Sequence, residues 1–222
     1  MKEVVLDTET TGLSVKDGHR IVEIGCIELD ELIPTKKIFH FYLNPERKVS
    51  EDSFKIHGYS DEFLSDKQKF SEIADNFLEF VKDKRIIIHN AEFDIAHINN
   101  ELLIAGKEKI TNKNIIDTLD IARNKFPGSP ISLDALCKRF RIDNSKREKH
   151  SALVDCELLA KVYINLIDQK EPKLNFNTAN EIQKNEDNQK IINYSKKIVK
   201  PSSEELKKHK EFMKKNFKKN FF

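Results

Sequence analysis

The sequence predicts an α/β fold in which a mixed five-stranded sheet is flanked by helices and followed by a flexible C-terminal tail. The first part of the chain holds three apolar segments separated by short turns, which is typical of an antiparallel meander. After it, segments of helical periodicity alternate with short apolar runs, the pattern of parallel strands that helices cover on both faces. Asparagine and lysine dominate 175–200 and glycine is absent there, which predicts a polar tail without a core of its own.

Five runs rich in apolar and β-branched residues predict the strands. They cover residues 4–6, 20–29, 38–43, 85–89 and 115–116. The glycines and polar residues of 8–18 predict a turn after the first run, and Asn44-Pro45 closes the third.

Apolar residues at helical spacing predict the helices around these strands. The periodic segments are 70–81, about 91–105 and 133–140, and then a last helix with an apolar stripe at Ala152, Cys156, Leu159 and Tyr163. Gly106 stands where the second of these helices should stop, and Ser132 is placed to cap the N-terminus of the third.

Composition excludes several classes of protein. No apolar run approaches the ~18 residues of a membrane-spanning helix, and the first residues do not resemble a secretory signal. Cys26, Cys137 and Cys156 lie far apart without a CxxC pair, which argues against a disulfide scaffold or a zinc ribbon. These features predict a protein of the reducing cytoplasm.

Charge divides the chain into two different parts. Residues 1–168 hold 25 Lys and Arg against 30 Asp and Glu, a net charge of −5, whereas residues 169–222 hold 14 Lys against 7 acidic residues, a net charge of +7. We therefore expect a folded domain over 1–168, a polar flexible linker over 169–200 and a basic tail over 201–222 that can form a short amphipathic helix.

Two carboxylates end the first predicted strand. Asp7 and Glu9 are two residues apart, so a strand would place both side chains on one face, where they repel each other unless a cation lies between them. A simple polar turn explains the same residues, and taken alone the pattern favours that explanation.

Of three further residues, two have an ordinary explanation when each is taken alone, and the third, Asp155, is unusual. Asp94 begins the helix after the fourth strand, where acidic residues commonly interact with the helix dipole. Asp155 lies beside the apolar stripe of the last helix, and an unpaired buried charge there would be costly. His150 precedes that helix, where a histidine is more often a cap or a surface residue than a catalyst.

Together, these residues predict a metal site at one edge of the sheet. Carboxylate oxygens select Mg²⁺ or Mn²⁺, and two such ions about 4 Å apart suit the in-line hydrolysis of a phosphodiester. A nearby histidine can take the proton of the attacking water. Residue spacing by itself thus indicates metal-dependent phosphoryl transfer.

Three motifs resemble those of the DEDDh branch of the DEDD 3′–5′ exonuclease superfamily. They are Val5-Leu6-Asp7-Thr8-Glu9-Thr10-Thr11-Gly12-Leu13, His89-Asn90-Ala91-Glu92-Phe93-Asp94 and His150-Ser151-Ala152-Leu153-Val154-Asp155. Ser151 stands where the related DEDDy branch would have tyrosine. Within the branch, residues 2–168 are similar to the proofreading epsilon subunits of bacterial DNA polymerase III, and four more strings support this: 56–58, 126–128, 132–137 and 142–147.

The resemblance implies an RNase H-like fold and a role for each motif residue. Asp7, Glu9 and Asp155 would bind two divalent cations, Mg²⁺ or Mn²⁺, and Asp94 would complete the acidic set. His150 would be the general base at the 3′-terminal phosphodiester of DNA. The metal ligands would contact the substrate too. His57 and Asp52 would contact the terminal nucleotide, although Asp52 could simply face water.

The resemblance also implies partners for the tail. In the epsilon family a clamp-binding peptide lies in the linker, and residues 171–176 resemble its Q-x-x-L-x-F pattern with Glu171 in place of glutamine. Leu174 and Phe176 would be the apolar anchors. Residues 203–222 would dock on the polymerase alpha subunit, and a basic disordered tail with incidental affinity for DNA explains the same composition.

Two other functions compete with DNA proofreading. An RNA-trimming exonuclease would use the same site, but the strings at 132–140 and 142–147 and the presence of a tail argue against it. A catalytically silent adaptor would be expected to lack a carboxylate or the histidine, and none is lost.

Overall fold

The computed structural model describes residues 2–111, 114–145, 147, 149–167 and 201–216. It divides into two units, Met1–Asn175 and Phe176–Phe222. The whole of the predicted linker 169–200, with the clamp-like peptide 171–176, lies outside the described residues. The proposed boundaries of the three segments therefore stay predictions.

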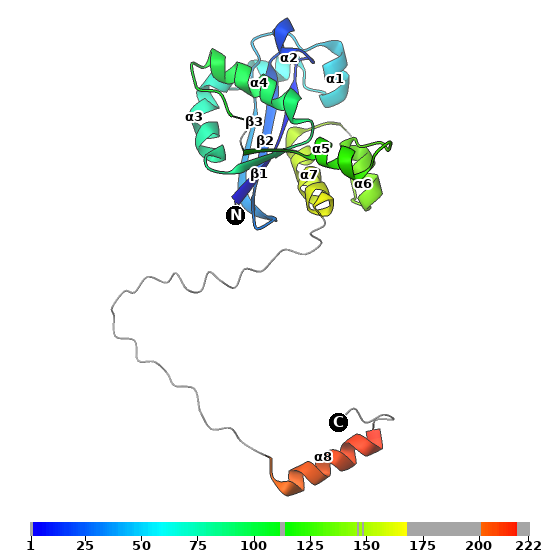
Figure 1. Cartoon of the computed structure of the whole chain (residues 1–222). Coiled ribbons are helices and arrows are strands. Elements are labelled where there is room, and N and C mark those ends of the chain that lie inside the picture. The colour runs from blue at the N-terminus through cyan, green and yellow to red at the C-terminus, as the bar shows by residue number, and fades with distance from the viewer. Residues whose placement is uncertain (1, 112–113, 146, 148, 168–200, 217–222) are drawn as a thin grey trace, which may run out of the picture. The chain divides into compact units, whose positions relative to one another are not determined.

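A mixed five-stranded sheet forms the centre of the first unit, as predicted (Figure 1). Its strands are β1 (Lys2–Thr10), β2 (Ile21–Asp30), β3 (Ile33–Tyr42), β4 (Arg85–Ile88) and β5 (Ile115–Asp117). They lie in the order β3-β2-β1-β4-β5. The first three pair antiparallel as a meander, whereas β4 pairs parallel with both β1 and β5.

Helices cover both faces of this sheet. They are α1 (Glu51–His57), α2 (Asp61–Ser65), α3 (Phe70–Val81), α4 (Ala91–Ile104), α5 (Thr118–Lys125), α6 (Leu133–Phe140) and α7 (Ala152–Leu166), with a short 3-10 turn at Val15–Asp17. Side-chain alternation along β1 separates two cores: Val4 and Leu6 pack with α3 and α4, and Val5 packs with α5, α6 and α7. The predicted N-cap is confirmed, because the Ser132 hydroxyl accepts a hydrogen bond from the backbone N–H of Ala135.

Several predicted boundaries are wrong for identifiable reasons. The polar residues at 8–10 belong to β1 rather than to a turn, because their backbone continues to pair with β2. β3 begins at Ile33 rather than Ile38, since its first half is mostly exposed and lacks an apolar run. The helices α1, α2 and α5 were not predicted, because each buries only one or two side chains and so shows no periodic stripe.

Helix α7 packs directly against the sheet at Gly25 of β2. A Cβ atom there would lie 2.7 Å from the backbone carbonyl carbon of Ala152, so only glycine leaves room for the first turn of α7. The Cys156 thiol extends the contact by donating to the carbonyl oxygen of Gly25 at 3.2 Å. This packing places the N-terminus of α7 beside the end of β1 that carries polar residues.

In the second unit the structure describes α8 (Ser203–Asn216), within the tail segment predicted to form a short helix. Ser202 and Glu205 form a reciprocal cap at its start: the hydroxyl of Ser202 accepts from the backbone N–H of Glu205, whose carboxylate accepts from the backbone N–H of Ser202 at 2.7 Å. Among the described helices of the chain, none has the length and apolar character needed to cross a membrane.

Candidate active site

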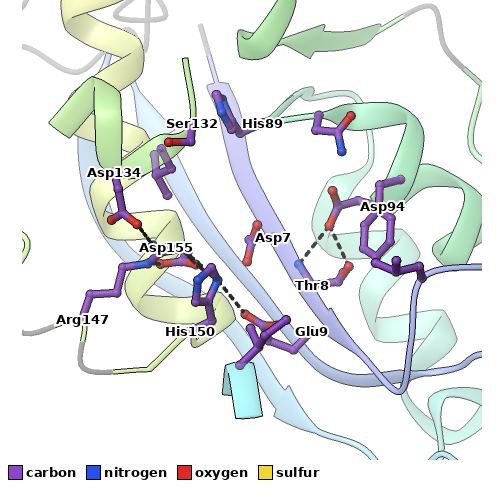
Figure 2. A pocket seen from close by; sticks show the side chains of 15 residues that line it. Asp7, Thr8, Glu9, His89, Asp94, Ser132, Asp134, Arg147, His150 and Asp155 are labelled. Carbon is purple, nitrogen blue, oxygen red and sulfur yellow. Dashed lines mark hydrogen bonds and ion pairs between the residues drawn. The ribbon is translucent and has the colours of Figure 1, made fainter. Parts of the chain in front are cut away.

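The predicted motif residues line one pocket of about 390 Å³ at the end of β1 (Figure 2). β1, the N-terminus of α4, the N-terminus of α6 and the segment leading into α7 surround it. Its lining combines the predicted carboxylates and His150 with polar and apolar neighbours: Asp7, Thr8, Glu9, Leu13, Ile56, His89, Asn90, Phe93, Asp94, Ser132, Leu133, Asp134, Arg147, His150 and Asp155.

The two carboxylates of β1 behave as the strand alternation predicts. Asp7 and Glu9 follow Val5 on the face of the sheet that α7 covers. Burial raises the pKa of Glu9 to about 8, and the charges of Asp155 and Glu23 add to the shift. Burial also holds the pKa of Asp7 well above its ordinary value, with Asp94 and Glu9 as the largest neighbouring charges. The two residues are therefore acids in an environment short of positive charge.

Asp94 enters the pocket from the first turn of α4. Its Oδ1 accepts hydrogen bonds from the backbone N–H of Thr8 at 3.0 Å and from the Thr8 hydroxyl at 2.6 Å. Burial raises the pKa of Asp94 to about 7, and these two hydrogen bonds lower it in part. The helix itself is held by Asp117 at the end of β5, whose carboxylate accepts from the backbone N–H groups of Asn90 and Ala91.

Asp155 enters from the first turn of α7 and forms an ion pair with Arg147. The guanidinium donates from Nε to Oδ1 at 2.5 Å and from Nη2 to Oδ2 at 2.7 Å, and its Nη1 donates to Asp134 at 2.7 Å. The Arg147 side chain is only 7% exposed. Arg147 therefore supplies a positive charge directly beside the buried carboxylate of Asp155.

His150 stands at the rim of the pocket with its side chain 46% exposed. Its Nδ1 lies 2.9 Å from Nη2 of Arg147, 3.6 Å from Oδ2 of Asp155 and 4.0 Å from Oε1 of Glu9. Because arginine can only donate, Nδ1 is the acceptor in the first contact and carries the lone pair of the ring. Burial and the charge of Arg147 lower the pKa of His150, which keeps the ring neutral near neutral pH.

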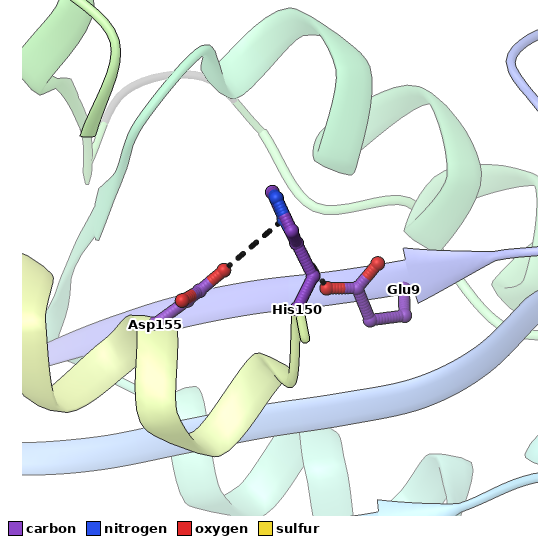
Figure 3. A group of neighbouring side chains, drawn as sticks. All are labelled: Glu9, His150 and Asp155. Atoms are coloured by element: carbon purple, nitrogen blue, oxygen red, sulfur yellow. Dashed lines mark ion pairs between the residues drawn. The ribbon is translucent and has the colours of Figure 1, made fainter. Parts of the chain in front are cut away.

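Glu9, His150 and Asp155 form a group with the geometry of a metal site. One potential ligand atom from each lies within 4.8 Å of the others (Figure 3). Figure 2 shows the Asp7 carboxylate between Asp94 and Asp155, which agrees with the mutual repulsion that raises its pKa. Buried carboxylates that repel each other are the donor set that a hard divalent cation stabilises, so the residues present fit such an ion.

The two predicted nucleotide contacts lie outside the residues that line the pocket. Asp52, on the outer surface of α1, is 92% exposed and pairs with Lys55 at 3.3 Å. His57 is buried at the end of α1, where its Nδ1 accepts from the backbone N–H of Tyr59 and its ring stacks on the Tyr59 ring. The adjacent Ile56 does line the pocket. The roles of Asp52 and His57 at the substrate stay predictions.

Sequence reasoning did not identify Thr8 as a site residue. It lies between Asp7 and Glu9, and the alternation that puts those two on one face turns Thr8 toward α4 and Asp94. A hydroxyl within an apolar strand, flanked by two carboxylates, was the signal in the sequence.

Comparisons with known proteins identify the family. The exonuclease family RNase_T matches residues 4–163. The chain is 50% identical to DNA polymerase III subunit epsilon of Rickettsia prowazekii (strain Madrid E), and 48% identical to that of Rickettsia felis, in both cases over 96% of each chain. It belongs to the epsilon-subunit family of exonucleases. The predicted membership of the DEDDh branch is thereby confirmed.

The epsilon subunit of Escherichia coli (strain K12) is 44% identical, over 73% of this chain and 70% of its own length. Among solved structures, exonuclease X in complex with 5′ overhanging duplex DNA is similar with a TM-score of 0.59 and 24% identity, over 75% of this chain and 92% of that one. Exonuclease I is similar with a TM-score of 0.67 and 18% identity, over 77% of this chain and 41% of that one. These likenesses show the RNase H-like exonuclease fold that the sequence predicts.

Proposed function

We propose that this chain is the proofreading subunit of the replicative DNA polymerase III and removes mispaired nucleotides from DNA 3′ ends. The observation that supports this most strongly is the convergence of Asp7, Glu9, Asp94 and Asp155 with His150 around one pocket. Membership of the epsilon-subunit family supports DNA as the substrate and the polymerase as the setting.

The acidic residues would hold two divalent cations, Mg²⁺ or Mn²⁺. Asp7, Glu9 and Asp155 would be the ligands, and Asp94, oriented by Thr8, would complete the set. When bound, the ions supply the positive charge that holds a phosphodiester and a water molecule together in the pocket. The raised pKa values of Asp7 and Glu9 support this assignment, since both carboxylates gain most from a nearby cation.

His150 acts as the general base in this proposal. Its Nδ1 lies 3.6 Å from Asp155 and 4.0 Å from Glu9, so a water molecule held by these carboxylates would lie within reach of the ring. The lowered pKa keeps the ring free to accept a proton. Arg147 must give up its contact with Nδ1 before that atom accepts the proton of the water. Attack on the terminal phosphodiester then releases a 5′-nucleotide.

Selection of mispaired ends needs no recognition of the mismatch itself. Proofreading needs a frayed or single-stranded 3′ end, and a mispaired terminus costs less to unpair than a paired one. The net charge of −5 on residues 1–168 predicts weak binding to DNA without help, so the polymerase raises the effective concentration of the primer end. Asp52 and His57 would contact the terminal nucleotide, and the metal ligands would lie beside its phosphate.

The C-terminal part would hold this nuclease in the cytoplasmic replisome. We propose that residues 201–222, with helix α8, dock on the polymerase alpha subunit, and that residues 171–176 contact the sliding clamp. The exposed apolar side chains of Leu206 and Phe212 on α8 support a protein partner over DNA alone.

Degradation of a 3′-labelled primer tests the function. The full chain is given paired and mispaired DNA and a matching RNA strand, each with Mg²⁺ and with EDTA, and His150→Ala is run in parallel. We expect metal-dependent release of mononucleotides from DNA, faster from the mispaired end and lost in the variant. Preference for RNA would place the protein among trimming enzymes, and absence of cleavage with bound metal would support a silent adaptor.

A further inference from the structure

A further carboxylate, that of Glu23, is fully buried within β2 but does not line the pocket. It stands in the otherwise apolar run IVEIGC, at a position where an ordinary strand would bury an aliphatic side chain. A buried charge is costly unless its hydrogen bonds are satisfied, so the surroundings of Glu23 must compensate for it.

Four donors from three parts of the chain saturate this carboxylate. Oε1 accepts from His40 Nε2 at 2.7 Å and from the Ser151 hydroxyl at 3.0 Å. Oε2 accepts from the Tyr59 hydroxyl at 2.7 Å and from the backbone N–H of Ala152 at 2.9 Å. Burial by itself raises the pKa of Glu23, but these hydrogen bonds outweigh it and lower the pKa, so the group is charged.

Two of the four donors belong to the N-terminus of α7. Ser151 is the N-cap residue of that helix, yet its hydroxyl makes no capping bond within the helix and donates to Glu23 instead. The free backbone N–H of Ala152 is satisfied by the same carboxylate. The cap of α7 therefore comes from a strand, and the negative charge lies where a helix N-terminus is stabilised by an anion.

This cap lies between two residues of the nuclease site. His150 directly precedes Ser151, and the backbone N–H of Asp155 donates to the carbonyl oxygen of Ser151 at 2.9 Å. A shift of Ser151 would therefore move both His150 and Asp155 relative to β1, which carries Glu9. Contact at Gly25 fixes how deep α7 packs against the sheet, and Glu23 fixes the direction in which its first residues point.

We propose that Glu23 is a positioning residue of the nuclease site: by capping α7 from β2, it holds the segment 150–155 so that His150 and Asp155 face Glu9. The inference rests on the proposed roles of His150 and Asp155. Outer groups that orient ligands and bases in this way typically contribute 10- to 100-fold to metal affinity or activity.

The test compares two buried glutamates of the same strand in the full chain. Glu23→Gln keeps the size of the side chain but places an amide N–H₂ against two donors. Glu28→Gln is the matched control, because Glu28 is equally buried on β2 but pairs with Lys84 and Lys37 away from the pocket. For each variant, kcat and KM on a single-stranded oligonucleotide, Mn²⁺ affinity by titration calorimetry, and Tm are measured.

We expect Glu23→Gln to lower kcat and Mn²⁺ affinity by about 10- to 100-fold each, with KM changed less than about threefold. Glu28→Gln should lower Tm and leave kcat and Mn²⁺ affinity within about twofold of wild type. Equal effects of the two variants on kcat and metal affinity would overturn the proposal, because a purely structural role predicts that result. A wild-type chain without metal-dependent cleavage would instead overturn the proposed function.

A second pair of variants keeps the test decisive if Glu23→Gln does not fold. Ser151→Ala removes the donor next to His150, and Tyr59→Phe removes a donor to the same carboxylate from a residue outside α7. We expect Ser151→Ala to reduce kcat at least fivefold more than Tyr59→Phe. Equal kcat values in the two variants would contradict the assignment.

Discussion

Neutralising Glu9 should stabilise the metal-free protein at alkaline pH, although Glu9 belongs to the nuclease site. The pKa of this carboxyl is about 8 in the folded chain, against an ordinary value of 4.5. Between these two values the folded protein binds more protons than the unfolded chain, so its stability falls as pH rises. Glu9→Gln removes the titrating group and with it this loss.

The expected gain follows from the size of the pKa shift. Each tenfold change in proton affinity corresponds to 1.36 kcal/mol, so a pKa raised from 4.5 to about 8 costs ~5 kcal/mol once the carboxyl is ionised. Part of this repulsion is shared with neighbouring carboxylates that stay in place, so Glu9→Gln should recover about 2–4 kcal/mol. For a domain of this size, that gain raises Tm by roughly 5–15 °C.

Urea unfolding in EDTA, followed by far-UV circular dichroism at about pH 5 and about pH 8.5, measures the effect. We expect Glu9→Gln to be more stable than wild type at the higher pH and nearly equal to it at the lower pH. Glu62→Gln, an exposed glutamate of α2, should stay within ~0.5 kcal/mol of wild type at both. A gain that does not depend on pH, or a loss of stability at alkaline pH, would refute the electrostatic reasoning.

Three further outcomes follow from the structure. Thr8→Val removes the hydroxyl donor to Asp94 but keeps the backbone donor, so we expect kcat to fall about tenfold while the fold is retained. Primer degradation and circular dichroism measure the two quantities, and an unchanged kcat would show that the Thr8 hydroxyl has no role in the site. Gly25→Ala drives a Cβ against the backbone of Ala152, so thermal unfolding should show a loss of about 1–3 kcal/mol, and an unchanged Tm would contradict the close packing. Mn²⁺ at about 100 times its dissociation constant should raise the free energy of unfolding of the wild type by about 2.7 kcal/mol, and that of Glu9→Gln much less. Equal shifts of Tm in thermal scans of the two proteins would argue against Glu9 as a ligand.

The sequence predicted the sheet and the acidic residues of the site because both leave local signals. Apolar runs marked all five strands, and carboxylates at the ends of such runs stood out because a charge there is costly. Asp7, Glu9, Asp94, Asp155 and His150 all line the pocket. The short helices and the first half of β3 left no such signal, since few of their side chains are buried.

Contacts between distant segments could not be predicted in this way. In the sequence Arg147 is only the last residue of the string 142–147, and the folded chain brings its guanidinium to Asp155 and Asp134. The cap that Glu23 gives to α7 joins residues 128 and 129 positions apart. Such pairs have no periodicity along the chain, so neither spacing nor composition indicates them.

The sequence by itself determined the fold class and the chemical character of the site, because these depend on local patterns of apolar and acidic residues, and its three motifs indicated the exonuclease family by resemblance. The tertiary structure decided which groups hold those residues in place: Thr8 orients Asp94, Arg147 neutralises Asp155, and Glu23 caps α7. It also placed Asp52 on the outer surface of α1. The physical reason is that hydrogen bonds and charge pairs act over a few ångströms in space, and only folding sets those distances.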